Sequence, residues 1–262
     1  MKTSLARSFQ YIYGPVPSWR LGSSLGIDLL SQKEKICSYD CLYCQLGQSK
    51  TLMVTRQPYV PEDDIMKELD MLPHNISIDY LTLSGRGEPT LAKNLGDMIK
   101  LLKKVRKEPV AVITNSSLIG RQDVREELSY ADFVIAKLDA CSQESFMKVN
   151  KPLPEMKFDN MVEGMEIFRK HFVGKMALQV MFMQENIKYA GEIAEIAKKI
   201  SPDEVQINTP LRPCAIDPIG RKELSEIKNL FCGLNAISVY ERTKRYFKPI
   251  SNRDTLKRRG KT

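Results

Sequence analysis

Residues 37–44 of the chain read Cys37-Ser38-Tyr39-Asp40-Cys41-Leu42-Tyr43-Cys44. Three of the six cysteines in this 262-residue sequence therefore stand within eight positions, with the spacing C-x3-C-x2-C. No apolar run approaches the roughly 20 residues that a membrane span needs, so we expect a cytoplasmic protein with reduced thiols. Thiolates this close repel one another unless a cation shares them, so the spacing indicates a metal site.

The number of available ligands narrows the kind of metal site. A structural zinc ion and an electron-transfer 4Fe–4S cluster each use four protein ligands. The sequence has no fourth Cys or His close to this loop. Three thiolates on a four-iron cluster leave one iron without a protein ligand, where a small molecule can bind. A zinc site or a plain iron–sulfur site remains the alternative.

The aromatic residue before the last cysteine, Tyr43, makes this loop resemble the C-x3-C-x-aromatic-C signature of radical S-adenosylmethionine (SAM) enzymes. The resemblance implies that Cys37, Cys41 and Cys44 hold a 4Fe–4S cluster whose open iron binds SAM, close to Tyr43. It also implies a low-potential electron donor of the ferredoxin or flavodoxin type. In that superfamily the reduced cluster cleaves SAM to a 5′-deoxyadenosyl radical, which takes a hydrogen atom from the substrate. The hard chemistry then belongs to the cofactors.

Hydrophobic periodicity predicts strands that alternate with amphipathic helices about six times. We expect strands at 26–30, 78–83, 110–113, 133–138, 177–183 and 205–207, and helices at 61–72, 95–107, 122–128, 160–172, 187–200 and 222–231. This alternation predicts an α/β fold with a parallel sheet, either doubly wound or an open barrel. The resemblance implies the second, a partial (β/α)6 barrel of the radical SAM type. We expect a single such domain at 1–240, with an N-terminal strap at 1–26, and a basic tail at 241–262.

The positive charge of the chain is concentrated in that tail. The sequence has 40 basic and 32 acidic residues, a formal net charge of +8. Residues 241–262 hold nine basic and two acidic residues, which is +7, so residues 1–240 carry only +1. Such a tail can contact RNA phosphates or an acidic partner, or it can be a solvated, frayed terminus.

The turn after the second predicted strand reads Ser84-Gly85-Arg86-Gly87-Glu88-Pro89-Thr90. Two glycines let the backbone approach a ligand closely, and Glu88 supplies a carboxylate. The segment resembles the Gly-Gly-Glu-Pro element that binds the SAM amino group in radical SAM enzymes, with Arg86 as an insertion. The resemblance implies SAM contacts for Ser84, Gly85, Gly87, Glu88 and Pro89. An ordinary turn between strand and helix is the alternative.

Polar residues also stand at the ends of the later strands. Asn115 lies in Thr114-Asn115-Ser116, where superfamily members often have Thr-Asn-Gly, and a helix cap is the alternative reading. Alternation places Lys137 and Asp139 on one face of a strand, where buried charges must pair with each other or with a ligand. The resemblance implies that these two contact the SAM carboxylate and ribose. The amides that could bind the adenine edge, or instead be satisfied barrel residues, are Gln179, Gln206 and Asn208.

The N-terminal segment Tyr13-Gly14-Pro15-Val16-Pro17, taken with the cysteine loop, resembles one branch of the superfamily. That branch contains poorly characterised iron–sulfur oxidoreductases and is grouped with the wyosine tRNA-base synthases. Hydrogen-atom abstraction needs no dedicated acid–base side chains, so the substrate cannot be read from the sequence. On charge and expected position, the candidates for contacting an anionic substrate are Arg20, Asn150 and Arg212. A tRNA-modifying enzyme that uses the basic tail, and a non-catalytic iron–sulfur or zinc protein, remain alternatives.

The other three cysteines have no comparable pattern. Cys141 and Cys214 follow the fourth and sixth predicted strands, where a second cluster or a reactive thiol is conceivable. Free cysteine more often packs in a core, and we expect this role for Cys232.

Overall fold

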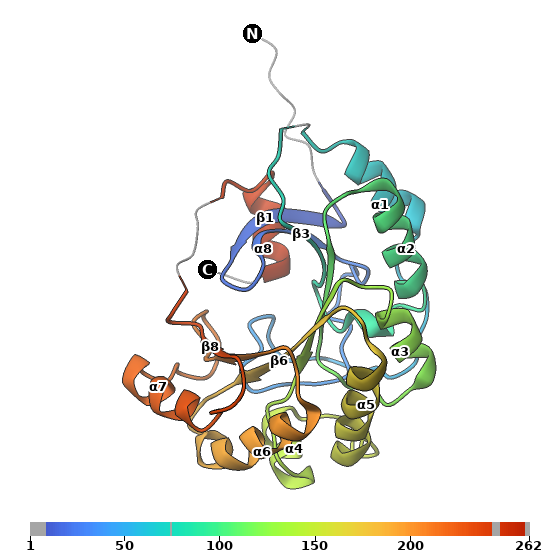
Figure 1. Ribbon diagram of the computed structural model, residues 1–262. Coiled ribbons are helices and arrows are strands. Elements are labelled where there is room, and N and C mark those ends of the chain that lie inside the picture. Colours follow the sequence, from blue (N-terminus) through green and yellow to red (C-terminus); the bar gives the residue numbers. More distant parts are fainter. Residues whose placement is uncertain (1–8, 74, 243–246, 260–262) are drawn as a thin grey trace.

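The computed structural model describes residues 9–73, 75–242 and 247–259. In these residues eight strands form one sheet, in which the spatial order of the strands is their order in the chain. The strands are β1 (Ile12–Ser18), β2 (Gly22–Ile27), β3 (Tyr80–Leu83), β4 (Val110–Thr114), β5 (Phe133–Lys137), β6 (Lys175–Met181), β7 (Glu204–Asn208) and β8 (Ala236–Ser238). β1 runs antiparallel to β2, and each later neighbouring pair is parallel. The sheet curls into a half-barrel that stays open between β1 and β8 (Figure 1).

Helices cover the convex side of this half-barrel (Figure 1). They are α1 (Glu62–Asp70), α2 (Leu95–Val105), α3 (Gln122–Leu128), α4 (Gln143–Val149), α5 (Phe158–His171), α6 (Ala190–Ile200) and α7 (Arg221–Asn229), with 3-10 helices η1 (Pro89–Leu91) and η2 (Ile187–Tyr189). The last helix, α8 (Asn252–Arg259), instead packs against the edge strand β1. On α2 the fully buried side chains Leu95, Met98, Ile99 and Leu102 recur at helical spacing and pack into the main core. Within the described parts of the chain, no helix is long and apolar enough to cross a membrane.

The predicted partial barrel is confirmed, and its six expected strands correspond to β2–β7. The sequence did not predict β1, β8, α4 or α8, and β8 has only three residues, too few to show a pattern. β2 begins at Gly22, four residues before the predicted start. The hydrophobic pattern did not indicate this part of the strand because it contains the polar residues Ser23 and Ser24. Ser23 donates to the Ser77 carbonyl at 2.6 Å, and the hydroxyls of Ser24 and Thr82 lie 2.7 Å apart. These hydrogen bonds allow both serines to be buried in a strand.

A small apolar cluster fills part of the concave side of the sheet. Val110 and Val112 belong to the main core under the helices, whereas Ala111 between them belongs to a separate cluster with Phe133, Ile135, Ala177 and Leu21. Side chains alternate across a strand, so this second cluster lies on the face away from the helices. Leu21 comes from the turn between β1 and β2, and that turn therefore packs into the interior of the half-barrel.

The described part of the basic tail is folded onto the N-terminal strand, which contradicts the solvated, frayed reading. Ile250 donates its N–H to the Gly14 carbonyl at 2.6 Å, and the Thr255 hydroxyl accepts from the Gly14 N–H at 3.1 Å. Arg258 is only 5% exposed and lies beside Asp28, so this tail residue is not available to RNA phosphates. Residues 243–246 and 260–262 of the tail, and 1–8 of the strap, lie outside the described residues. The division between a domain at 1–240 and a tail stays a prediction.

Asp28 is the buried partner of this C-terminal helix. It follows β2, is 1% exposed, and has one carboxylate oxygen 3.6 Å from the Arg258 Nε. Its other oxygen accepts from the Leu30 N–H at 3.0 Å. Burial raises the pKa of Asp28 to about 6, and the Arg258 charge opposes this rise.

This raised pKa predicts a pH dependence of stability. The folded protein holds the Asp28 proton more tightly than the unfolded chain, whose carboxyl has a pKa near the usual 3.8. The free energy of unfolding should therefore fall as the pH rises from the unfolded pKa of 3.8 to the folded pKa of about 6, by up to about 1.4 kcal/mol per pH unit, and level off above about pH 6. Urea unfolding of the wild type and of Asp28→Asn between pH 5 and 7 tests this. The difference between the two curves should change with pH, and parallel curves would contradict the assignment.

Candidate functional site

A cavity of about 340 Å³ opens at the carboxyl ends of the parallel strands and contains the cysteine loop. This is the edge at which ligands bind in barrels and in open α/β sheets. The residues predicted from the sequence that line it are Arg20, Cys37, Cys41, Tyr43, Cys44, Gly87, Glu88, Asn115, Lys137, Gln179, Asn208 and Arg212. The predicted residues that do not line it are Ser84, Gly85, Pro89, Asp139, Asn150 and Gln206. The lining also includes Trp19, Gln45, Thr114, Met181 and Thr209, which the sequence did not single out.

Each of the three cysteine sulfurs in the cavity has a side chain nearby that donates an N–H to it. The Asn115 amide lies 3.6 Å from the Cys37 Sγ, and the Asn150 amide lies 3.5 Å from the Cys41 Sγ. The Lys35 ammonium lies 3.3 Å from the Cys44 Sγ. Donors of this kind stabilise a thiolate more than a thiol, because they place a positive or partly positive hydrogen next to the negatively charged sulfur.

The raised pKa values of two of the cysteine thiols indicate that the site needs a bound cation. Burial raises the pKa of the Cys37 thiol to about 12, and the neighbouring Cys41 adds to the rise. Burial and then Asp139 raise the pKa of the Cys41 thiol to about 11. Cys37 and Cys41 therefore cannot both be thiolates at neutral pH unless a bound cation shares their negative charge.

The arrangement fits an iron–sulfur cluster. Across residues 9–73, 75–242 and 247–259, no group of three or more Cys, His, Asp or Glu side chains is placed to hold a single metal ion. A four-iron cluster does not need its thiolates to meet at one point, because each thiolate binds a different iron atom. Three cysteines facing one cavity, each with a donor on its sulfur, could hold such a cluster and leave its fourth iron toward the cavity.

The glycine-rich turn is fixed against the start of the cysteine loop. Ile36 donates its N–H to the Arg86 carbonyl at 3.1 Å, and Glu88 donates its N–H to the Ile36 carbonyl at 2.9 Å. A Cβ atom on Gly87 would lie 1.6 Å from the Ile36 carbonyl oxygen, so only glycine allows this approach. Gly85 likewise allows the turn to approach Asp28 closely, because a Cβ atom on Gly85 would lie 2.2 Å from the Asp28 Cγ.

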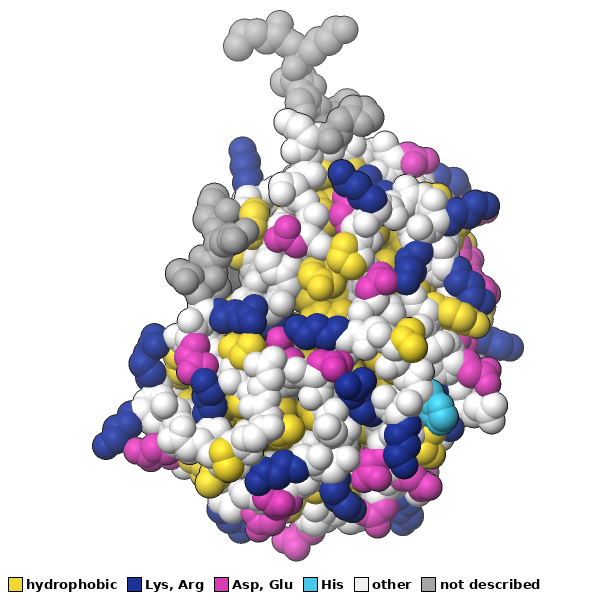
Figure 2. Space-filling view, in the orientation of Figure 1, with side chains coloured by type: hydrophobic (Ala, Val, Ile, Leu, Met, Phe, Trp, Pro, Cys, Tyr) yellow, Lys and Arg dark blue, Asp and Glu magenta, His cyan; other side chains and the backbone are white. Residues whose placement is uncertain are grey.

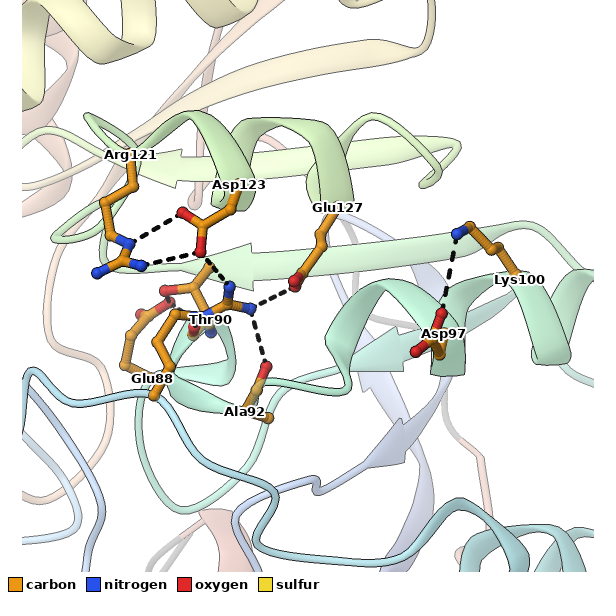
Figure 3. A network of polar contacts seen from close by, with 9 residues as sticks. Glu88, Thr90, Ala92, Asp97, Lys100, Arg121, Asp123 and Glu127 are labelled. Atoms are coloured by element: carbon orange, nitrogen blue, oxygen red, sulfur yellow. Dashed lines mark hydrogen bonds and ion pairs between the residues drawn. The ribbon is translucent and has the colours of Figure 1, made fainter.

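Glu88 lies beside Thr90 in the turn after β3 (Figure 3) and links this turn to the end of β4. It is 1% exposed, and one oxygen accepts from the Thr90 N–H at 3.1 Å and from the Thr114 hydroxyl at 2.6 Å. The other oxygen accepts from the Asn115 N–H at 2.5 Å. Burial raises the pKa of Glu88, while these hydrogen bonds oppose the rise. The carboxylate thus fixes the β4 end beside the cavity.

A second group of contacts, which the sequence did not indicate, fixes the same turn. The Arg56 guanidinium donates to the Thr90 carbonyl at 2.8 Å and to the Ala92 carbonyl at 3.1 Å. It also pairs with Asp123 at 2.9 Å and with Glu127, both on α3 (Figure 3). Arg56 follows the cysteine loop by a dozen residues, so the chain on both sides of that loop is tied to the turn that carries Glu88.

Asn115 contacts the cysteine loop from the end of β4. Its amide donates to the Ser38 hydroxyl at 2.9 Å as well as to Cys37. The next residue, Ser116, has φ 69°, in the left-handed region that favours glycine. This explains why Thr-Asn-Gly is the more usual form of the motif, and serine costs about 1 kcal/mol or more at such a position.

Tyr43 and Asp139 belong to a buried network behind the cysteines. Asp139 accepts hydrogen bonds from the Tyr43 hydroxyl, from the Met181 N–H at 2.8 Å and from the Asn150 amide at 3.0 Å. Its carboxylate also lies 3.1 Å from the Lys137 ammonium, which is 4.8 Å from the Tyr43 ring centre. Burial, and then Asp139, raise the pKa of Tyr43 well above its usual value, so Tyr43 donates. The predicted pairing of Lys137 with Asp139 is present, and Lys137 alone of the two lines the cavity.

The three predicted amides divide in a similar way. Gln179 and Asn208 line the cavity, whereas Gln206 is fully buried below it. The Gln206 side chain accepts from the Gln179 amide at 3.2 Å and donates to Glu204 at 2.9 Å. Gln206 therefore orients Gln179 and has no direct access to a ligand.

Two of the three predicted substrate residues face the cavity from opposite edges of the half-barrel. Arg20 lies in the turn between β1 and β2, with its guanidinium carbon 5.2 Å from the Trp19 ring centre. Arg212 follows β7 and donates to the Gln45 side chain of the cysteine loop at 2.8 Å. Asn150 lies elsewhere, since it is 4% exposed and its amide points to Cys41 and Asp139.

The remaining cysteines lie outside the cavity. The Cys141 N–H donates to the Ser145 hydroxyl at 3.0 Å at the start of α4, and the Cys214 thiol donates to the Ile216 carbonyl at 3.2 Å. Cys232 is exposed beyond α7, so the expectation of a core position was wrong.

Comparison with known proteins agrees with this geometry. Residues 35–201 match the model of the Radical SAM superfamily. The chain is 39% identical over 207 residues to a UPF0026 protein of Synechocystis sp., covering 79% of this chain and 77% of the relative. Its fold is similar to that of anSMEcpe with bound AdoMet (TM-score 0.59, 18% identity, 83% of this chain and 64% of that one). It is also similar to archaeal TYW1 (TM-score 0.56, 14% identity, 81% and 72%).

The match covers the cysteine loop, the glycine-rich turn and strands β3–β6, which build much of the cavity, whereas Arg20, Asn208 and Arg212 of its lining lie outside the matched range. The cofactors of this family are a 4Fe–4S cluster and SAM. The chain belongs to the radical SAM superfamily.

Proposed function

We propose that the protein is an enzyme that reductively cleaves SAM at a 4Fe–4S cluster held by Cys37, Cys41 and Cys44. The observation that carries this proposal is that all three sulfurs face the cavity at the carboxyl ends of the strands, each with its own N–H donor. With both cofactors bound, one electron from an external donor of ferredoxin or flavodoxin type would break the S–C5′ bond, giving methionine and a 5′-deoxyadenosyl radical.

The residues of the chain would then bind and orient SAM. The Lys137 ammonium, positioned by Asp139, would pair with the SAM carboxylate. Glu88 and the Gly87 backbone would lie beside the amino group, and the amides of Gln179 and Asn208 are suited to the edge of the adenine ring. Lys137 is held by Asp139, Glu88 by Thr114 and Asn115, and Gln179 by Gln206, and side chains fixed in this way favour binding in one orientation.

The test is anaerobic incubation of the reconstituted protein with SAM and dithionite. We expect a brown protein that forms 5′-deoxyadenosine, measured by mass spectrometry. A colourless protein that retains one zinc ion, or a cluster-loaded protein that forms no 5′-deoxyadenosine, would overturn the proposal.

We further propose that the substrate is an anion. Among the described residues that line the cavity, Arg20, Lys137 and Arg212 are cationic, and Glu88 is the acidic side chain, already occupied by hydrogen bonds from the protein. Two arginines that approach from opposite edges are suited to carboxylate or phosphate groups.

The expected result is that the compound consumed together with SAM carries a carboxylate or a phosphate. Untargeted mass spectrometry of a metabolite extract and of digested RNA, each treated with the reconstituted protein with and without SAM, identifies it. Arg212→Met should lower its turnover at least about tenfold, the loss of one charge-assisted hydrogen bond. A neutral compound would contradict this part of the proposal.

A further inference from the structure

The side-chain donors on the three cysteine sulfurs are not equivalent. Two are neutral amides, at 3.6 Å from Cys37 and 3.5 Å from Cys41. The third, on Cys44, is the ammonium group of Lys35, and at 3.3 Å its contact is the shortest of the three. A positive charge therefore lies against one particular ligand of the site.

Lys35 is held in this position by two further groups. Its ammonium donates to the Gly47 carbonyl at 2.8 Å and lies 3.5 Å from the Asp40 carboxylate. The Lys35 side chain is only 7% exposed, whereas that of Asp40 is 22% exposed. A lysine is rarely buried to this extent unless it is paired, so the loop between Asp40 and Gly47 is folded around its ammonium group.

Reduction of a cluster at this site would add one electron and no proton, so its net charge would become more negative by one. A fixed cation at hydrogen-bond distance from a ligand sulfur stabilises the more negative state. Net charge and hydrogen bonds to the sulfurs are the features that set the potential of an iron–sulfur cluster. Asp40 offsets part of this effect, but it is the more exposed of the pair and is therefore better screened by water.

We propose that Lys35 is a positioning residue that raises the reduction potential of the cluster through its contact with Cys44. This inference rests on the proposed function, since it requires the cluster. It gives a role to a residue that stands outside the C-x3-C-x2-C motif, because the Lys35 charge would make the cluster easier to reduce before SAM is cleaved.

The test is a redox titration of the reconstituted protein with dithionite, without SAM, followed by electron paramagnetic resonance. Lys35→Met should reduce the ratio of reduced to oxidised cluster at least tenfold at a fixed potential, which is a shift of 59 mV to a lower midpoint. Lys35→Arg retains the charge and the donors and should stay within about threefold of the wild type. Lys33→Met is the matched control, because it removes an exposed positive charge two residues away and should also stay within that limit.

Three results would overturn the inference. They are an unchanged midpoint in Lys35→Met, an equal shift in Lys33→Met, or a Lys35→Arg variant that behaves like Lys35→Met. If Lys35→Met does not retain a cluster, Lys35→Gln keeps a donor for Gly47 without the charge, and its midpoint must still fall. If the wild type forms 5′-deoxyadenosine but these variants show no shift in midpoint potential, the inference about Lys35 is wrong and the proposed function stands. If the wild type binds no cluster, the proposed function itself is wrong.

Discussion

Replacing Cys41 with alanine is expected to abolish both the brown colour of the reconstituted protein and the formation of 5′-deoxyadenosine. Cys41 lies between the other two ligands in the loop, and its Sγ receives the Asn150 amide at 3.5 Å. A cluster left with two protein thiolates loses an anchoring bond as well as one of its negative charges. Loss of an outer-shell partner alone costs 10–100-fold in metal affinity, so we expect loss of a ligand to exceed about 100-fold.

Cys214→Ala is the matched control for this variant. Cys214 is also a half-buried free thiol, but it lies outside the cavity and donates to the Ile216 carbonyl. Iron content, visible absorption and 5′-deoxyadenosine are measured on both variants after the same anaerobic reconstitution. If Cys41→Ala retained product formation while Cys214→Ala lost it, the cluster would have to be assigned to other cysteines.

The parts of the site that the sequence could predict are those formed by residues close to one another in the sequence. Cys37, Cys41 and Cys44 lie in one loop, and Gly87 and Glu88 lie in one turn, so each motif carries its own geometry. The alternation of strands and helices likewise follows from local periodicity, which is why β2–β7 were expected. Lys137 and Asp139 could be paired in advance because two residues on one strand face share a side.

The parts that the sequence could not predict depend on contacts between distant segments. Asn150 was expected at the substrate, yet the fold places it behind Cys41, more than a hundred residues earlier in the chain. The packing of Arg258 against Asp28 brings together α8 and the segment after β2, which are far apart in the sequence, and composition suggested only a basic tail. The sequence did not single out Lys35, whose burial depends on how the chain from Asp40 to Gly47 packs around its ammonium group.

The face seen in Figure 2 shows why net charge was a poor guide to the site. Basic and acidic side chains are interspersed over it, and dark blue and magenta groups lie next to one another in its middle. The positive lining of the cavity comes from a few residues with specific partners, such as Lys137 with Asp139. The charge of such a site depends on which side chains are paired and buried there, so the overall charge of +8 does not indicate it.

Replacing Asp139 with alanine is expected to lower the free energy of unfolding by about 3–5 kcal/mol, the usual cost of removing one partner of a buried ion pair. Asp139 has a fully buried side chain, and the Lys137 side chain is only 10% exposed, so the variant leaves an ammonium group with little access to water. The Tyr43 hydroxyl, the Asn150 amide and the Met181 N–H also lose their acceptor.

Lys137→Met is the comparison that separates charge from packing. It removes the cation but leaves Asp139 with its three hydrogen-bond donors, so its loss of stability should be smaller than that of Asp139→Ala. Adding Lys137→Met to Asp139→Ala should then recover part of the lost stability, because no unpaired charge remains buried. Urea unfolding of the three variants and the wild type, at equal cofactor loading, measures the coupling. If the double variant were less stable than Asp139→Ala by the full cost of Lys137→Met, the two side chains would act independently. The network around Asp139 would then contribute hydrogen bonds and packing to the cavity wall, and the ion pair would contribute nothing to its stability.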